Sequence, residues 1–239
     1  MSMKAIYDLA PQRDTNRIML VMLPSAKARP QDLLQYGFVR ALRERGLPID
    51  VVTVDAHLGY YLERSFSKHL TRDIIAPARA RNYRRIWFMG ISLGGMGSLI
   101  YALEHSADIE GVILLAPFLG ARGTIAEVER AGGLGGWQPG AIKADDDERH
   151  LLAWIKAYRS DAGDLPKIFL GYGTDDRFAA ASKILAERLP AAQVVTIQGG
   201  HDWATWTRLW QLLLDTDLFS GAKKVALKRV AVPNNLVIT

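Results

Sequence analysis

Six short runs of apolar residues, rich in valine, isoleucine and leucine, recur along this chain of 239 residues. Within each run the apolar residues are nearly continuous and do not alternate with polar ones, which is typical of strands buried on both faces. The predicted strands are residues 18–23, 49–54, 86–91, 111–116, 167–172 and 193–198. Strands of this kind form a parallel sheet that helices cover on both sides.

Helical patterns separate these runs. In the segment 32–45 apolar residues recur at helical spacing, and Gly46 follows as a typical helix end. Comparable segments are 63–82, 93–105, 178–188 and 202–214. The alternation predicts an α/β fold, with a mostly parallel central sheet of about six strands flanked by helices. Because few residues precede the first strand, we expect no antiparallel hairpin at the start of the sheet.

The interval between the strands at 111–116 and 167–172 is longer than one crossover requires. It contains several glycines, Trp137 and a run of acidic residues, then a helical pattern. Its tryptophan and leucine side chains favour burial over a disordered linker, so we expect a small helical cap insertion at about 118–165, over the carboxyl edge of the sheet. The chain is then one domain over 1–219 with a basic tail at 220–239.

The net charge of +5 does not indicate a nucleic-acid partner. Four cations, Lys223, Lys224, Lys228 and Arg229, lie in the tail, which contains no acidic residue and leaves the rest of the chain nearly neutral. No basic stripe interleaved with aromatic residues extends this patch. We therefore expect a solvated tail and no nucleic-acid partner.

Absent residue types and patterns narrow the function further. The chain has no cysteine, which excludes disulfides, thiolate metal sites, iron–sulfur clusters and a cysteine nucleophile. No apolar run approaches the ~18 residues of a membrane helix, and the first residues lack the apolar core of a secretory signal. The sequence therefore predicts a cytoplasmic protein without a membrane span.

A glycine–serine motif marks the point where the third predicted strand meets the helix that follows it. The motif is Gly90-Ile91-Ser92-Leu93-Gly94. A serine on such a sharp turn has a strained backbone and tolerates only small neighbours two residues away, which the two glycines provide. The helix N-terminus behind it favours developing negative charge. The motif indicates Ser92 as a nucleophile; the alternative is a glycine-rich turn where helix and strand pack closely.

A serine nucleophile requires a base that takes its proton. Among the five histidines, His201 follows the last predicted strand in a loop that begins with two glycines and leads into a helix. His57 also follows a strand at this edge but precedes the serine in the chain, and the other three lie in predicted helices or in the insertion. We predict that His201 is the base; the alternative is an ordinary loop that caps the last helix.

Two adjacent aspartates, Asp175 and Asp176, follow the fifth predicted strand. Both emerge at the edge where the serine and the histidine lie, so either could orient the histidine ring, and one could cap the following helix. Asp202 is adjacent to His201 in the chain and is better suited to cap the last helix.

The order Ser92, aspartate, His201 on successive strand ends resembles the α/β-hydrolase superfamily over roughly residues 18–214. Within it, Gly-Thr-Asp-Asp at 173–176 and Gly-Gly-His-Asp-Trp at 199–203 are similar to the serine esterase-like group that includes feruloyl and siderophore esterases. In that pattern the acid stands three residues after the glycine, so the resemblance implies Asp176 in this role.

The resemblance also implies an oxyanion hole, for which backbone N–H groups are needed rather than a particular side chain. The histidine–glycine motif that the family carries after the first strand is replaced here by Leu23-Pro24-Ser25-Ala26. Leu93 should supply one N–H and either Ser25 or Ala26 the other, since proline has none.

These patterns predict a carboxylesterase-like serine hydrolase that cleaves a small carboxylic ester or thioester through an acyl-enzyme, without a cofactor or metal. Phe118, Leu119 and Trp137 are expected to contact the substrate. The alternatives are an acyltransferase or thioesterase that acts on a carrier-bound acyl group, and a non-catalytic member of the fold that binds a ligand. The sequence leaves the oligomeric state open, including a homodimer.

Overall fold

The computed structural model describes residues 2–11 and 17–219. Within them seven strands form one sheet in the order β1-β3-β2-β4-β5-β6-β7. The strands are β1 (Ala5–Asp8), β2 (Ile18–Leu23), β3 (Ile49–Val54), β4 (Arg85–Ile91), β5 (Gly111–Leu115), β6 (Lys167–Gly173) and β7 (Val194–Ile197). All neighbouring strands are parallel except β1, which runs antiparallel to β3 at one edge. The mostly parallel α/β fold is confirmed.

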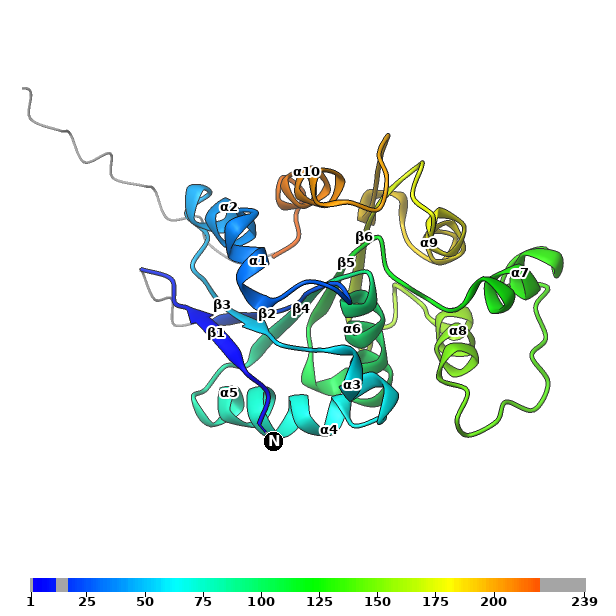
Figure 1. Ribbon diagram of the computed structural model, residues 1–239, viewed down its shortest axis with the longest axis horizontal. Helices are drawn as coiled ribbons and strands as arrows, with labels where there is room; N and C mark the ends of the chain where they lie inside the picture. The colour runs from blue at the N-terminus through cyan, green and yellow to red at the C-terminus, as the bar shows by residue number, and fades with distance from the viewer. Residues whose placement is uncertain (1, 12–16, 220–239) are drawn as a thin grey trace, which may run out of the picture.

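Helices cover both faces of this sheet, with α1, α2 and α10 on one face and α3 to α6, α8 and α9 on the other (Figure 1). The helices are α1 (Pro30–Gln35), α2 (Phe38–Glu44), α3 (Leu58–Leu62), α4 (Phe66–Leu70), α5 (Ala76–Ala80), α6 (Leu93–Glu104), α7 (Arg122–Arg130), α8 (Asp147–Ala157), α9 (Ala179–Ala186) and α10 (Trp203–Leu214). A π-helical segment, η1 (Thr71–Ile75), joins α4 to α5, and two short 3₁₀ segments are η2 (Ser106–Asp108) and η3 (Ala191–Gln193).

The two-sided burial of the strands explains their continuous apolar character. In β2 all six residues are buried; Met19 and Val21 belong to one core, and Leu20 and Met22 to the other. In the second of these cores α10 packs against α2, where the indole N–H of Trp210 donates a 3.0 Å hydrogen bond to the carbonyl oxygen of Phe38. This contact fixes the last helix on its layer.

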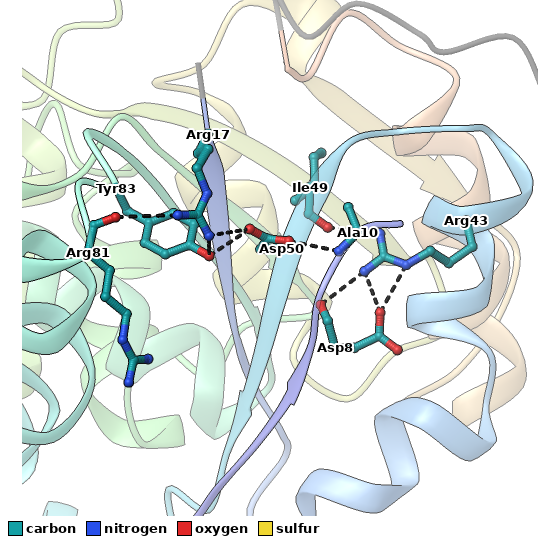
Figure 2. Close-up of polar contacts among 8 residues, drawn as sticks. All are labelled: Asp8, Ala10, Arg17, Arg43, Ile49, Asp50, Arg81 and Tyr83. Atoms are coloured by element: carbon teal, nitrogen blue, oxygen red, sulfur yellow. Dashed lines mark hydrogen bonds and ion pairs between the residues drawn. The ribbon is translucent and has the colours of Figure 1, made fainter. Parts of the chain in front are cut away.

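The sheet has seven strands where about six were expected, and the additional strand, β1, pairs with β3 and forms no hairpin with β2. β1 is only four residues long and partly exposed at the sheet edge, so it lacks the long apolar run that marks the other strands. Next to it, Arg43 of α2 donates to the carboxylate and to the carbonyl oxygen of Asp8 (Figure 2). These contacts connect β1 to the helix layer.

A buried carboxylate provides a second anchor for this edge of the sheet (Figure 2). Asp50 of β3 is only 4% exposed. Its carboxylate accepts hydrogen bonds from the backbone N–H of Ala10 (2.7 Å), the hydroxyl of Tyr83 (2.6 Å) and the guanidinium of Arg17 (3.1 Å). Asp50 therefore links the residues that follow β1 to those that precede β2 and β4.

The segment 118–165 contains α7 and α8, and α8 packs against α6. Leu151, Leu152 and Ile155 of α8 are buried in the same core as Leu99 of α6. The apolar side chains of the segment are therefore buried beside α6, as an ordered insertion requires, and a cap over the carboxyl edge stays a prediction. The predicted basic tail at 220–239 lies outside the described residues. Among those that are described, no helix combines the length and the apolar character needed to cross a membrane.

Candidate active site

The turn between β4 and α6 holds Ser92 in a strained conformation, with φ 53° and ψ −113°. Both neighbouring glycines are required by close backbone contacts. A Cβ on Gly90 would lie 2.2 Å from the carbonyl oxygen of Gly94, and one on Gly94 would lie 2.2 Å from that of Leu23. The turn therefore brings the loop after β2 directly against the start of α6.

Three side chains form a hydrogen-bonded chain at this turn. The Oγ atom of Ser92 lies 3.0 Å from Nε2 of His201, and Nδ1 of the same ring lies 2.8 Å from Oδ2 of Asp176. The side chain of Asp176 is fully buried and that of His201 is 9% exposed. The residues come from the loops after β4, β6 and β7, so the parallel sheet brings together positions that are up to 109 residues apart.

The two adjacent aspartates differ in what they contact. The second carboxylate oxygen of Asp176 accepts a 2.7 Å hydrogen bond from the backbone N–H of Phe178, which fixes the carboxylate toward His201. Asp175 is exposed, and its carboxylate contacts only the hydroxyl of Thr174, at 3.4 Å, among the residues that the structure covers. Of the two candidates, Asp176 is the one that reaches the histidine.

The loops that carry Asp176 and His201 are in backbone contact. A Cβ on Gly173 would lie 2.2 Å from the carbonyl oxygen of Gly199, and the backbone N–H of Asp175 donates to that same oxygen at 3.0 Å. Glycine at 173 is therefore needed for the two loops to approach so closely.

Two aromatic rings enclose the imidazole of His201. The rings of Phe178 and Trp206 meet it edge-on, with centroids 4.8 and 4.9 Å away. They hold the imidazole plane and restrict the access of water to it. Asp202 does not contact the ring within the described structure; its carboxylate accepts from the backbone N–H of Thr205 and caps α10.

The residues expected to bind an oxyanion lie beside the turn. Leu93 is the first residue of α6, and Ser25 and Ala26 follow β2. Throughout the described ranges, the backbone N–H groups of these three residues donate to no protein acceptor. They are therefore available to a negatively charged oxygen next to Ser92.

A pocket of about 390 Å³ contains Ser92 and His201. Its lining consists of Ser25, Ala26, Lys27, Ala28, Asp32, Ser92, Arg177, His201, Asp202, Trp203 and Trp206. None of these residues comes from the segment 118–165. Lys27, Arg177 and Trp203 were not predicted as site residues, although each lies within two residues of one that was.

None of the three expected substrate contacts lines this pocket. Leu119 and Trp137 are buried in the core, and the indole N–H of Trp137 donates to the carboxylate of Glu127 at 2.8 Å. Phe118 is half-buried; its backbone N–H donates a 2.9 Å hydrogen bond to the carbonyl oxygen of Ser92, and its ring meets that of Phe178 edge-on. The side chains of Leu119 and Trp137 therefore lie in the core and do not line the pocket.

A larger cavity of about 580 Å³ lies along α6, between Met96 and His105, and contains none of the three hydrogen-bonded residues. Within residues 2–11 and 17–219, no three histidine or acidic side chains gather closely enough to hold a metal ion. The chemistry that the arrangement at Ser92 can perform is nucleophilic attack by a hydroxyl next to a base and oxyanion donors.

Comparison with protein families gives one match that covers most of the chain. The family described as "Putative esterase" matches residues 61–218, which include the serine turn and both loops that carry the aspartate and the histidine. No curated protein matches the chain.

Solved structures share the fold at low sequence identity. A monoacylglycerol lipase from Paleococcus ferrophilus is 15% identical with a TM-score of 0.57, and covers 90% of this chain and 99% of its own. Est1E from Butyrivibrio proteoclasticus, solved with ferulic acid bound, is 17% identical with a TM-score of 0.56 and coverage of 90% and 95%. An S-formylglutathione hydrolase from Staphylococcus aureus is 18% identical with a TM-score of 0.54 and coverage of 82% and 79%.

Proposed function

This chain belongs to the esterase family of α/β-hydrolases, and we propose that it is a serine hydrolase that cleaves a small carboxylic ester or thioester through an acyl-enzyme. The observation that carries this proposal is the continuous hydrogen-bonded chain from Ser92 through His201 to Asp176. The strained turn and the unengaged N–H groups beside it support the same assignment.

In the first half-reaction the hydroxyl of Ser92 attacks the carbonyl carbon while its proton passes to Nε2 of His201. Asp176 accepts the hydrogen bond from Nδ1, keeps the ring in the reactive tautomer and stabilises the imidazolium that forms. The carbonyl oxygen becomes an oxyanion, which accepts hydrogen bonds from the N–H of Leu93 and from that of Ser25 or Ala26. When the oxyanion collapses, the alcohol or thiol leaves with the proton from Nε2.

In the second half-reaction water takes the place of the alcohol. His201 removes a proton from the water as it attacks the acyl-enzyme, and the same N–H groups bind the second oxyanion. The carboxylic acid leaves when Ser92 recovers its proton from the imidazolium. Each step needs only groups of this chain and water.

Labelling with a fluorophosphonate probe tests the nucleophile directly. We expect one adduct per chain, located on Ser92 by peptide mass spectrometry, because the probe reacts with a serine whose proton a base removes. Labelling should be lost in Ser92→Ala and strongly reduced in His201→Ala. Ser106→Ala, in η2 and away from the site, should be labelled like the unmodified protein.

Hydrolysis of p-nitrophenyl acetate provides the second measurement. Ser92→Ala should lower kcat by at least about 10³-fold, with circular dichroism showing that the variant remains folded. An adduct on another serine, or turnover in Ser92→Ala at the unmodified level, would overturn the proposal.

A further inference from the structure

Four charged residues line the pocket around Ser92, and the two acids are already engaged. The carboxylate of Asp32 accepts a 2.7 Å hydrogen bond from the backbone N–H of Arg29 at the start of α1. The carboxylate of Asp202 accepts a 2.9 Å hydrogen bond from that of Thr205 at the start of α10. Both negative charges therefore face the positive ends of helices, which offset much of their field over the pocket.

The two cations, Lys27 and Arg177, have no such partners. Both side chains are exposed, and neither forms an ion pair or hydrogen bond with any residue in 2–11 or 17–219. The guanidinium of Arg177 packs 4.9 Å from the ring centroid of Phe178. The guanidinium therefore lies over this ring, and its N–H groups donate to no acceptor within the described residues.

The loops that carry the cations lie on different sides of the reacting serine. Lys27 follows β2 and Arg177 follows β6, whereas Ser92 follows β4, which lies between these strands in the sheet. Lys27 is also adjacent to Ala26, one of the two candidates for the second oxyanion donor. A substrate bound at Ser92 therefore extends past one cation or the other.

From these contacts we propose that Lys27 and Arg177 form an anion subsite of the reaction pocket, and that the substrate is an ester whose acyl or alcohol part carries a carboxylate. This inference rests on the proposed function, because it describes the substrate of the same site. A carboxylate supplies the acceptor oxygens that the guanidinium and the ammonium lack in the free protein. The subsite adds affinity for charged esters and leaves the hydrolytic step unchanged.

Two pairs of esters that differ only in charge test the subsite. In the first pair the charge is on the leaving group: 4-carboxyphenyl acetate against 4-carbamoylphenyl acetate. In the second it is on the acyl group: 4-nitrophenyl 4-carboxybenzoate against 4-nitrophenyl 4-carbamoylbenzoate. The ratio of kcat/KM within each pair is divided by the ratio of the hydroxide-catalysed rates, which removes the difference in intrinsic reactivity.

We expect the protein to prefer the carboxylate by about 5-fold or more in at least one pair, mainly through a lower KM. Lys27→Gln or Arg177→Gln should reduce this preference by about 2- to 5-fold, and the double variant should abolish it. Added salt should weaken the preference, since exposed charges are screened. Lys68→Gln, which removes an exposed cation outside the pocket, should leave it unchanged.

The outcomes separate this inference from the proposed function. If the neutral esters are hydrolysed in a manner that depends on Ser92, but neither pair shows a preference for the carboxylate, the subsite is overturned and the hydrolase stands. The subsite is also overturned, and the hydrolase stands, if the preference for the carboxylate survives in the double variant. If the protein hydrolyses none of the four esters faster than Ser92→Ala does, the proposed function fails, and the subsite with it.

Discussion

Oδ2 of Asp176 lies 2.8 Å from Nδ1 of His201, whereas the adjacent carboxylate of Asp175 is exposed and contacts Thr174. The two aspartates follow each other in one loop and have the same charge, so they form a matched pair. Their different surroundings separate the effect of a negative charge near the pocket from that of a hydrogen bond to the histidine.

The first prediction concerns this pair. Asp176→Asn should lower kcat for an ester by roughly 10³- to 10⁴-fold, because an amide at this position no longer selects the tautomer in which Nε2 accepts a proton. Asp175→Asn should change kcat by less than about 2-fold, as expected for an exposed charge. Steady-state kinetics of both variants check this, and equal losses in the two would contradict it.

The second prediction concerns the contact between α6 and the loop after β2. Gly94→Ala places a methyl group against the carbonyl oxygen of Leu23 and should lower the free energy of unfolding by about 1–3 kcal/mol. Because this loop continues into Ser25 and Ala26, kcat should fall as well. Gly123→Ala is the control: nothing lies within 4 Å of its Cβ position in α7, so the variant should gain up to about 1 kcal/mol with unchanged activity. Urea denaturation gives the free energy of unfolding of both variants, and steady-state kinetics give their kcat. An unchanged kcat in Gly94→Ala would argue against the oxyanion role of the loop after β2.

The third prediction concerns the buried carboxylate of Asp50. Asp50→Asn should destabilise the fold by about 1–3 kcal/mol, since it weakens three hydrogen bonds and leaves donors without a charged acceptor. Tyr83→Phe removes one of these bonds and should cost about 1 kcal/mol. Asp8→Asn breaks a more exposed ion pair with Arg43 and should cost less than about 1 kcal/mol. Thermal unfolding ranks the three variants by their loss of stability. A larger loss in Asp8→Asn than in Asp50→Asn would contradict the prediction that the buried carboxylate contributes more than the exposed ion pair.

The fourth prediction concerns the acid dependence of stability. Hydrogen bonds from Arg149, together with one from the Trp137 indole to Glu127, lower the pKa of the Glu127 and Asp146 carboxyls below their usual values. A carboxyl with a lowered folded-state pKa stabilises the fold fully above its unfolded-state pKa, and this contribution is lost as the pH falls through the folded-state value.

Arg149→Gln should therefore lower the Tm at pH 7, and the difference from the unmodified protein should shrink as the pH falls below about 4. Arg122→Gln removes an exposed cation of α7 that forms no ion pair within the described residues and is not among the groups that lower either pKa, and it serves as the control. A difference that stays constant from pH 7 to pH 3 would show that Arg149 acts through packing alone.

The sequence predicted most of the sheet because its central strands are buried on both faces. Six of the seven strands coincide closely with the continuous apolar runs, and the loops that follow them carry Ser92, Asp176 and His201. β1 was not predicted, because an edge strand of four residues needs no continuous apolar run. Similarly, the segment expected as one helix over 63–82 contains α4, η1 and α5, whose shared apolar face gives a single periodic pattern.

The residues that each side chain contacts were harder to predict than the helices and strands. The apolar character of Trp137 indicates burial, but the sequence does not say whether a core or a substrate covers it. Asp50, Arg17 and Tyr83 come from three segments that carry no common motif, so nothing marks them as partners before the sheet brings them together. The choice of Asp176 over Asp175 came from the resemblance to a family, since the residues alone left both open.

The hydrogen bond between Trp210 and Phe38 has a consequence for the histidine. His201 lies two residues before the first residue of α10. This helix is fixed to α2 by the Trp210–Phe38 bond and by Arg45, which donates to the carbonyl oxygen of Gln211 at 3.2 Å. The position of the imidazole thus depends on contacts made at the far end of the helix. We expect heating that loosens this layer to displace the histidine while the central strands are still paired, so that ester hydrolysis is lost at a lower temperature than the one at which the sheet melts.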